Sequence, residues 1–112
     1  MTSHVTTHVL DTTLGRPAAG VSVTLSLVDE RVVEPMAVGT TDDDGRLGDL
    51  GPKHLPAGTY RLTFDTGAYF ARDDRPTFFP TVELTFTVTT LDEHYHVPLL
   101  LSPFAYSTYR GS

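Results

Sequence analysis

The amino-acid sequence predicts an all-β protein, an antiparallel β-sandwich formed by a single domain that spans residues 1–112. Apolar and polar residues alternate at period two along most of the chain, as they do at Val21, Val23, Leu25 and Leu27. These runs are rich in β-branched and aromatic side chains, and turn-forming residues separate them. Because each run would place its apolar side chains on one face of a sheet, two sheets must pack together to bury those faces.

The order of the elements follows from the alternation and the turns. We expect strands near residues 4–10, 20–28, 36–41, 58–65, 81–90, 94–101 and 104–110. The turns include Asp43-Asp44-Gly45 and Pro56-Ala57-Gly58, where Gly and Pro supply the backbone angles that tight turns need. A helical turn near 67–73 is too short to be more than a connector. The strand at 94–101 ends apolar on both faces, which indicates that a second subunit covers it.

Composition and charge exclude several classes of protein. The formal net charge is −6, whereas a protein that binds nucleic acid or an anionic membrane needs a cationic surface. The chain has no Cys, which excludes disulfides, thiolate metal sites and a Cys nucleophile. No stretch approaches the ~18 consecutive apolar residues of a membrane span, and the first residues do not resemble a signal peptide. We therefore expect a cytoplasmic protein.

Histidines are the first candidates for chemistry, and the chain has five: His4, His8, His54, His94 and His96. His94 and His96 would share one face of a strand, ~6.6–7 Å apart along the backbone. With a third imidazole from His8 or His4, this pair would make a Zn²⁺ site with an open water position. The same pair also suits metal-free acid/base catalysis, or two ordinary polar positions at the start of a strand. The residues alone leave these three interpretations open.

Arg46 and the C-terminal segment are the other candidates. Arg46 follows the acidic turn that ends at Gly45, and it is either a solvated charge or a guanidinium directed into a pocket. In a pocket it would bind a carboxylate, amide or ring oxyanion, and it would lower the pKa of a nearby His. The segment Tyr106–Ser112 carries more aromatic and polar groups than a frayed chain end needs. It either packs as the last strand or delivers polar groups to a site.

Three segments of the chain resemble motifs of the transthyretin-like protein family. His4–Asp11, with Gly15–Ala18, is similar to the N-terminal motif, and His94–Pro103 is similar to the penultimate strand. Tyr106–Ser112 resembles the C-terminal signature of the family's 5-hydroxyisourate hydrolases. That signature separates these enzymes from transthyretin, the hormone carrier of the same fold. The resemblance spans the whole chain.

This resemblance implies a prealbumin-like sandwich of seven or eight strands with one short helix. It also implies a homotetramer with active sites at the dimer–dimer interface. The activity implied is hydrolytic opening of 5-hydroxyisourate to 2-oxo-4-hydroxy-4-carboxy-5-ureidoimidazoline in urate degradation, with no metal or cofactor. By position, the resemblance implies catalytic roles for His8, Arg46, His96 and Ser112. It implies that the substrate is bound by His8, Arg46, His96, Tyr109, Arg110 and Gly111. The family motif, rather than spacing, selects His96 over His94.

A mechanism follows as a hypothesis. A neutral imidazole, of His8 or His96, removes a proton from water, and Arg46 stabilises the anionic tetrahedral centre that forms. The second His then protonates the departing ring nitrogen. The alternatives are a transthyretin-like carrier that binds a small ligand without turnover, and a structural sandwich with incidental histidines. A cleft lined by imidazoles and a guanidinium fits catalysis better than it fits the apolar channel of a carrier.

Overall fold

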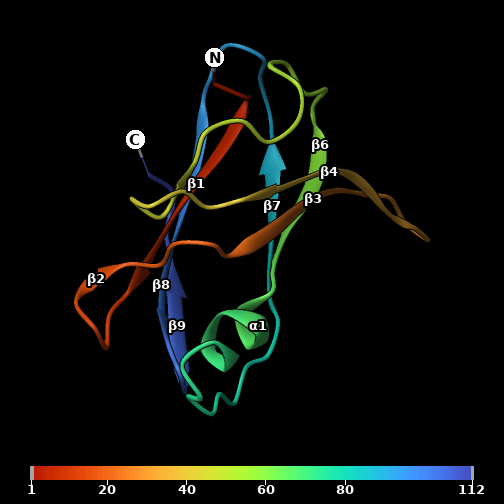
Figure 1. The fold of residues 1–112 in the computed structure, drawn as a ribbon. Helices are drawn as coiled ribbons and strands as arrows, with labels where there is room; N and C mark the ends of the chain where they lie inside the picture. Colours follow the sequence, from red (N-terminus) through yellow and green to blue (C-terminus); the bar gives the residue numbers. More distant parts are fainter. Residues whose placement is uncertain (1, 112) are drawn as a thin grey trace.

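The computed structural model describes residues 2–111, which form two packed β-sheets and one short helix (Figure 1). The first sheet has the order β2-β1-β8-β9, with β5 also paired to β1, and the second has the order β4-β3-β6-β7. The strands of the first sheet are β1 (Val5–Asp11), β2 (Arg16–Pro17), β5 (Arg46–Leu47), β8 (Tyr95–Ser102) and β9 (Ala105–Thr108). Those of the second are β3 (Ser22–Val28), β4 (Val33–Thr40), β6 (Gly58–Phe64) and β7 (Val82–Val88).

The predicted sandwich is confirmed, and every expected strand is present with small shifts at its ends. The expected helical turn is α1 (Thr66–Ala71), which connects β6 to the loop before β7. The two-residue strands β2 and β5 were not predicted, because two residues are too few to show a period. One pair departs from antiparallel pairing: β1 and β8 run parallel, with Thr6 opposite His96. Within residues 2–111, no helix has the length and apolar composition needed to cross a membrane.

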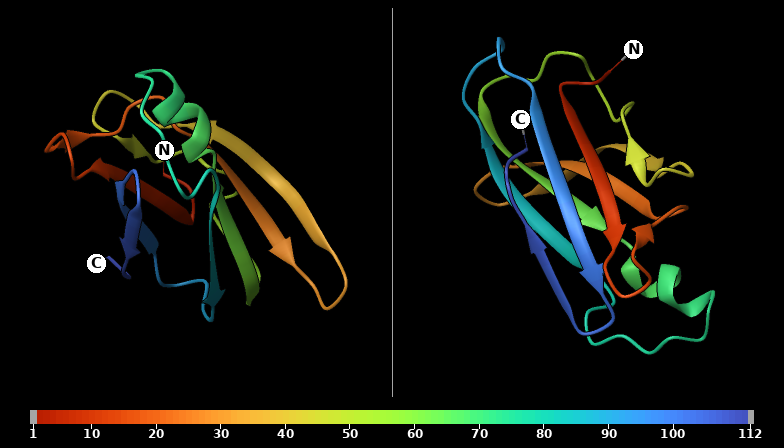
Figure 2. Two further views of the ribbon diagram at one scale, coloured as in Figure 1. Left: turned by 90° about the horizontal axis from the view of Figure 1, so that it is seen from below. Right: turned by 90° about the vertical axis from the view of Figure 1, so that its left-hand side faces the viewer.

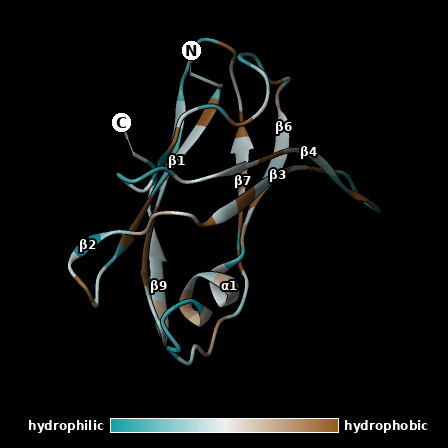
Figure 3. Cartoon of the chain, viewed as in Figure 1, coloured by the Kyte–Doolittle hydropathy of each residue, from teal (hydrophilic) through white to brown (hydrophobic). Residues whose placement is uncertain are grey.

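The core lies between the two sheets. Val9, Leu25, Leu62, Phe64 and Leu99 are among its fully buried side chains, and each occupies the inward position of its strand's alternation. Figure 3 shows hydrophilic residues concentrated in the turns, including the loop after α1. The alternation that predicts the strands therefore also predicts many of the side chains that form the core. The expectation is wrong for Leu27, which is 36% exposed while Ser26 is buried, because the pairing of β3 with β4 shifts its register between Leu25 and Ser26.

A buried ion pair attaches the end of β1 to the segment that contains α1. The carboxylate of Asp11 accepts hydrogen bonds from Arg75 at 2.7 Å and from the hydroxyl of Tyr69 at 2.8 Å. Burial on its own would raise the pKa of Asp11, but Arg75, the backbone N–H of Leu14 and Tyr69 together lower it. The carboxylate is therefore charged at neutral pH, and it holds β1 in a defined position against the rest of the fold.

The topology brings distant parts of the chain together at one end of the first sheet. Figure 2 shows β1 and β8 side by side, with the end of the chain returning beside β8. On its other edge, β1 pairs with β5, so that His8 lies opposite Arg46. After β9, the chain forms an isolated bridge between Gly111 and His96. Residues from the beginning, the middle and the end of the sequence therefore converge here.

Candidate active site

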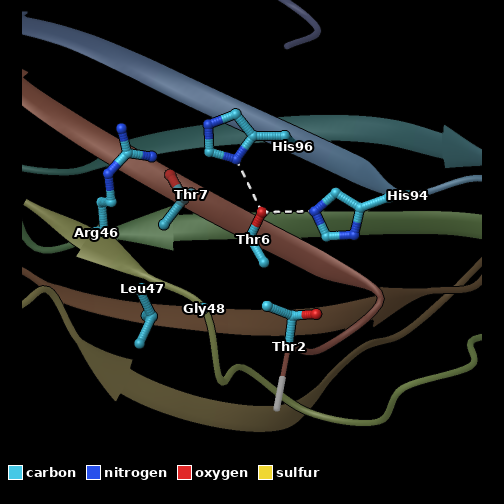
Figure 4. Close-up of a pocket in the computed structure, with 8 residues that line it drawn as sticks. All are labelled: Thr2, Thr6, Thr7, Arg46, Leu47, Gly48, His94 and His96. Carbon is cyan, nitrogen blue, oxygen red and sulfur yellow. Dashed lines mark hydrogen bonds between the residues drawn. The ribbon is translucent and has the colours of Figure 1, made fainter. Parts of the chain in front are cut away.

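The candidate site lies on the outer face of the first sheet, where β5, β1 and β8 are neighbours. Directly paired residues of adjacent strands project on the same face, so Thr6 projects with His96, and His8 projects with Arg46. A pocket of about 310 Å³ opens at this position (Figure 4). It is lined by Thr2, Thr6, Thr7, Arg46, Leu47, Gly48, His94 and His96.

His96 has the properties of a general base. Its side chain is half-buried, and Nδ1 lies 2.8 Å from the hydroxyl of Thr6. Burial lowers the pKa of His96, and electrostatic repulsion from Arg46, His8 and His94 lowers it further. A histidine whose pKa is lowered is neutral at pH 7, so it has a lone pair with which to accept a proton. Arg46 thus acts on the pKa of His96 in the direction that the sequence leads us to expect.

The acidic turn before Arg46 builds the backbone that positions this side chain. One carboxylate oxygen of Asp42 accepts hydrogen bonds from the backbone N–H groups of Asp44 and Arg46, each at 2.9 Å. Gly45 adopts φ +75°, and a Cβ added there would collide with the carbonyl oxygen of Val9, so only glycine fits. The run of Asp residues is thus a turn, as predicted, and it presents an exposed Arg46 at the rim of the pocket.

The same turn also orients His8. Nε2 of His8 donates a hydrogen bond to the carbonyl oxygen of Asp44 at 2.9 Å. A carbonyl oxygen can only accept, so Nε2 carries the hydrogen and Nδ1 is the ring nitrogen left for proton transfer. His8 is not among the residues that line the pocket, although it is close enough to affect the pKa of His96.

Thr6 is a member of the site that the sequence analysis did not identify. Its side chain is only 7% exposed, and its hydroxyl lies 2.8 Å from Nδ1 of His96 and 2.9 Å from Nε2 of His94. The alternation places Thr6 on the same face as His8. However, the contact with the two histidines depends on the pairing of β1 with β8, which the sequence pattern does not reveal.

The described residues of the C-terminal segment contact His96 at one point and line a second pocket at another. The backbone N–H of Gly111 donates to the carbonyl oxygen of His96 at 2.8 Å, which places Gly111 against the imidazole. Tyr109 and Arg110 instead line a second pocket of about 350 Å³, where the Arg110 guanidinium lies 4.6 Å from the centre of the Tyr95 ring. In the single chain, these two residues therefore do not join the pocket that His96 lines. Ser112 lies outside the described residues.

The remaining histidines do not join this cluster. His4 is buried, with Nε2 donating to the carbonyl oxygen of Glu93 at 2.7 Å and Nδ1 accepting from the N–H of Leu55 at 2.8 Å. Both ring nitrogens are thus used in holding the fold, and neither is available to a metal. His54 is exposed, with its ring centre 6.3 Å from that of His4. Across residues 2–111, no group of three or more His, Cys, Asp or Glu side chains is arranged to hold a metal ion.

Comparison of the sequence and the fold with those of known proteins identifies the family of this chain. Residues 5–111 match the profile of the HIUase/Transthyretin family. The 5-hydroxyisourate hydrolase of Mus musculus is 46% identical over 113 residues, which cover 98% of this chain and 96% of the mouse protein. The structure of the Klebsiella pneumoniae 5-hydroxyisourate hydrolase aligns with a TM-score of 0.84 at 41% identity, covering 96% of this chain and 98% of that one.

Transthyretin from Sparus aurata also has this fold. It aligns with a TM-score of 0.90 at 33% identity, covering 96% of this chain and 95% of that one. A hydrolase and transthyretin therefore share the backbone, so the fold by itself does not separate their functions. The side chains on the outer face of the first sheet have to make that distinction.

Proposed function

This chain belongs to the HIUase/transthyretin family, and we propose that it is a hydrolase that opens the ring of 5-hydroxyisourate in urate degradation. The product is 2-oxo-4-hydroxy-4-carboxy-5-ureidoimidazoline. The observation that carries the proposal is His96, a half-buried imidazole with a lowered pKa, lining one pocket with the Arg46 guanidinium. Full-length similarity to proteins named for this activity supports the choice of substrate.

In the proposed mechanism, neutral His96 removes a proton from a water molecule as the oxygen of that water attacks a ring carbonyl. The tetrahedral centre that forms carries a negative charge, which the guanidinium of Arg46 stabilises. His8, as an imidazolium with a hydrogen on each ring nitrogen, then gives its Nδ1 proton to the departing ring nitrogen, and the carbon–nitrogen bond breaks. The proton that His96 took from water returns to solvent, and His8 takes one up, before the next turnover. His96 is assigned as the base because its pKa is lowered, which leaves His8 as the acid, and Nδ1 is the nitrogen that gives the proton because Nε2 is held by the carbonyl oxygen of Asp44.

The C-terminal residues complete the proposed site. Gly111 lies against His96, and we assign Ser112, the next residue, to orienting water or substrate. Tyr109 and Arg110 are proposed to bind substrate in the assembled protein, and we place the active sites at the interface between dimers. We propose a cytoplasmic homotetramer in which the outer faces of the first sheets meet. The half-buried pair Leu10 and Leu100, directly opposite each other on that face, supports this arrangement.

The experiment that tests the function follows 5-hydroxyisourate generated in situ, whose decay is measured by ultraviolet absorbance with and without the protein. Acceleration above the spontaneous rate supports the proposal, and an unchanged rate refutes it. Tight binding of a small aromatic ligand without turnover would instead identify a carrier. Native mass spectrometry tests the tetramer, since a monomer that turns over substrate would exclude sites shared between subunits.

A further inference from the structure

A single hydroxyl group lies between two imidazoles in the site. The Oγ1 atom of Thr6 is 2.8 Å from Nδ1 of His96 and 2.9 Å from Nε2 of His94, and Figure 4 shows both contacts. Both distances are those of good hydrogen bonds. Thr6 is almost completely buried, so water does not compete easily for its hydroxyl.

The hydroxyl of Thr6 has a single hydrogen, which it can donate to only one of the two histidines. When both rings are neutral, the hydrogen bonds can therefore be arranged in two ways. A threonine hydroxyl donates one hydrogen bond and accepts others through its lone pairs. If Thr6 donates to His94, the ring of His96 must donate from Nδ1, and its Nε2 has a free lone pair. If Thr6 donates to His96, Nε2 of His96 carries the hydrogen and has no lone pair to offer. The state of Thr6 therefore decides whether His96 can act as a base through Nε2.

The surroundings of His96 favour the first form. The charged and titratable groups that face it are Arg46 from β5, His8 from β1 and His94 from the segment before β8, and the backbone of Gly111 covers it from the C-terminal segment. Figure 4 shows the ring nitrogen of His96 that does not bind Thr6 turned to the side of Arg46. A lone pair near a guanidinium is more favourable than an N–H group there, because the charge attracts the lone pair and repels the hydrogen.

We propose that Thr6 is a positioning residue that holds His96 in the tautomer protonated at Nδ1, and that His94 orients Thr6 by accepting its hydroxyl hydrogen. Nε2 of His96 is then the basic atom directed at the pocket. This inference rests on the proposed function, since it identifies what prepares His96 for the hydrolysis. It gives His94 a role that does not require contact with the substrate.

The direct test measures the ring nitrogens of ¹⁵N-histidine-labelled protein by NMR, at a pH where His96 is neutral. The wild type is expected to show a protonated Nδ1 and an unprotonated Nε2 at His96. Thr6→Val removes the hydroxyl, and His94→Leu frees the hydroxyl to donate to His96, so both variants are expected to move the hydrogen toward Nε2. Thr6→Ser should keep the wild-type pattern. Thr7→Val is the matched control for this pattern, because the hydroxyl of Thr7 donates to the carbonyl of Val97 instead.

The kinetic test separates positioning from substrate contact. Thr6→Val and His94→Leu are each expected to lower kcat by about tenfold to a hundredfold, below the full effect of a general base, with KM changed by less than about threefold. Thr6→Ser should restore kcat. His94 is exposed, so its substitution remains informative even where Thr6→Val fails to fold.

The inference is overturned if neutral wild-type His96 carries its hydrogen on Nε2, or if Thr6→Val and His94→Leu leave the ring nitrogens unchanged. Failure of the proposed function is a separate result. It appears as an absence of turnover by the wild type, whereas the ring-nitrogen measurement needs no substrate.

Discussion

Gly111→Ala is expected to inactivate the protein while leaving its fold intact. A Cβ built at Gly111 lies 2.6 Å from Cδ2 of His96, 3.3 Å from Cγ and 3.4 Å from Cβ. The nearest of these contacts is about 0.8 Å closer than the 3.4 Å at which ordinary van der Waals contact begins. The imidazole cannot yield freely, because Nδ1 is held by Thr6 at 2.8 Å. Either the ring leaves Thr6, or the C-terminal segment leaves the ring.

Both outcomes disturb the site by close to an ångström. A misplacement of about 1 Å can cost a catalysed reaction about a hundredfold in rate, so we expect kcat/KM to fall by about that factor. Stability should change by less than about 0.5 kcal/mol, since Gly111 follows the last strand and its contacts involve one backbone hydrogen bond. The loss of activity should therefore not be accompanied by unfolding.

The assay combines the decay of 5-hydroxyisourate with thermal unfolding monitored by circular dichroism. Gly58→Ala is the matched control, because the nearest atom to a Cβ at Gly58 is 3.8 Å away on Tyr60, which is ordinary contact. This control should keep wild-type activity. The reasoning is refuted if Gly111→Ala retains wild-type kcat/KM, or if its activity falls only in proportion to a loss of folded protein.

Three further predictions concern the charge, the stability and the end of the chain. Arg46→Ala should lower kcat by about 10²–10³-fold with almost no change in melting temperature. The acidic limb of the pH profile of kcat/KM should also move to higher pH, because losing this cation raises the pKa of His96. A profile that does not move would contradict the electrostatic role. Asp11→Asn should cost about 3 kcal/mol in the free energy of unfolding at pH 7, measured with denaturant, because it removes the buried carboxylate that pairs with Arg75 and leaves only the longer contact to the exposed Asp73. Since the folded pKa of Asp11 is lowered, its contribution in the wild type is present above the unfolded value of 3.8 and is lost as pH falls through the folded pKa. Removing residues 109–112 should abolish turnover while the melting temperature stays close to that of the wild type, since β9 ends at Thr108. Full activity of the truncated protein would show that this segment is not part of the active site.

Most of the fold could be predicted, because the alternation of apolar and polar residues indicates which face of each strand enters the core. Val21, Val23, Leu25 and Leu27 are predicted to share a buried face; the first three are fully buried, but Leu27 is exposed beyond the register shift of β3. The short strands β2 and β5 escaped prediction because their pairing with β1 comes from tertiary contact rather than from a local pattern. For the same reason, the alternation of apolar and polar residues does not predict which strands are neighbours, or that β1 and β8 run parallel.

The candidate site was predicted in part. His96 and Arg46 line one pocket as expected, His8 lies beside Arg46, and Gly111 contacts His96. However, Tyr109 and Arg110 both line a second pocket, where Arg110 stacks on Tyr95, while the backbone of Gly111 contacts His96. A motif gives the residues in order, but the direction of each side chain depends on the path of the backbone after β9.

The sequence by itself determined the sandwich, the acidic turn at Gly45 and the identity of the histidine, arginine and C-terminal motifs. These are local properties, since they depend on side-chain period, on the backbone angles a residue permits and on its chemistry. Only the tertiary structure decided that Thr6 would bind both His94 and His96, and that His4 would be a buried support of the fold. The physical reason is distance along the chain: Thr6 and His96 meet because core packing aligns β1 with β8, and no local pattern encodes that register.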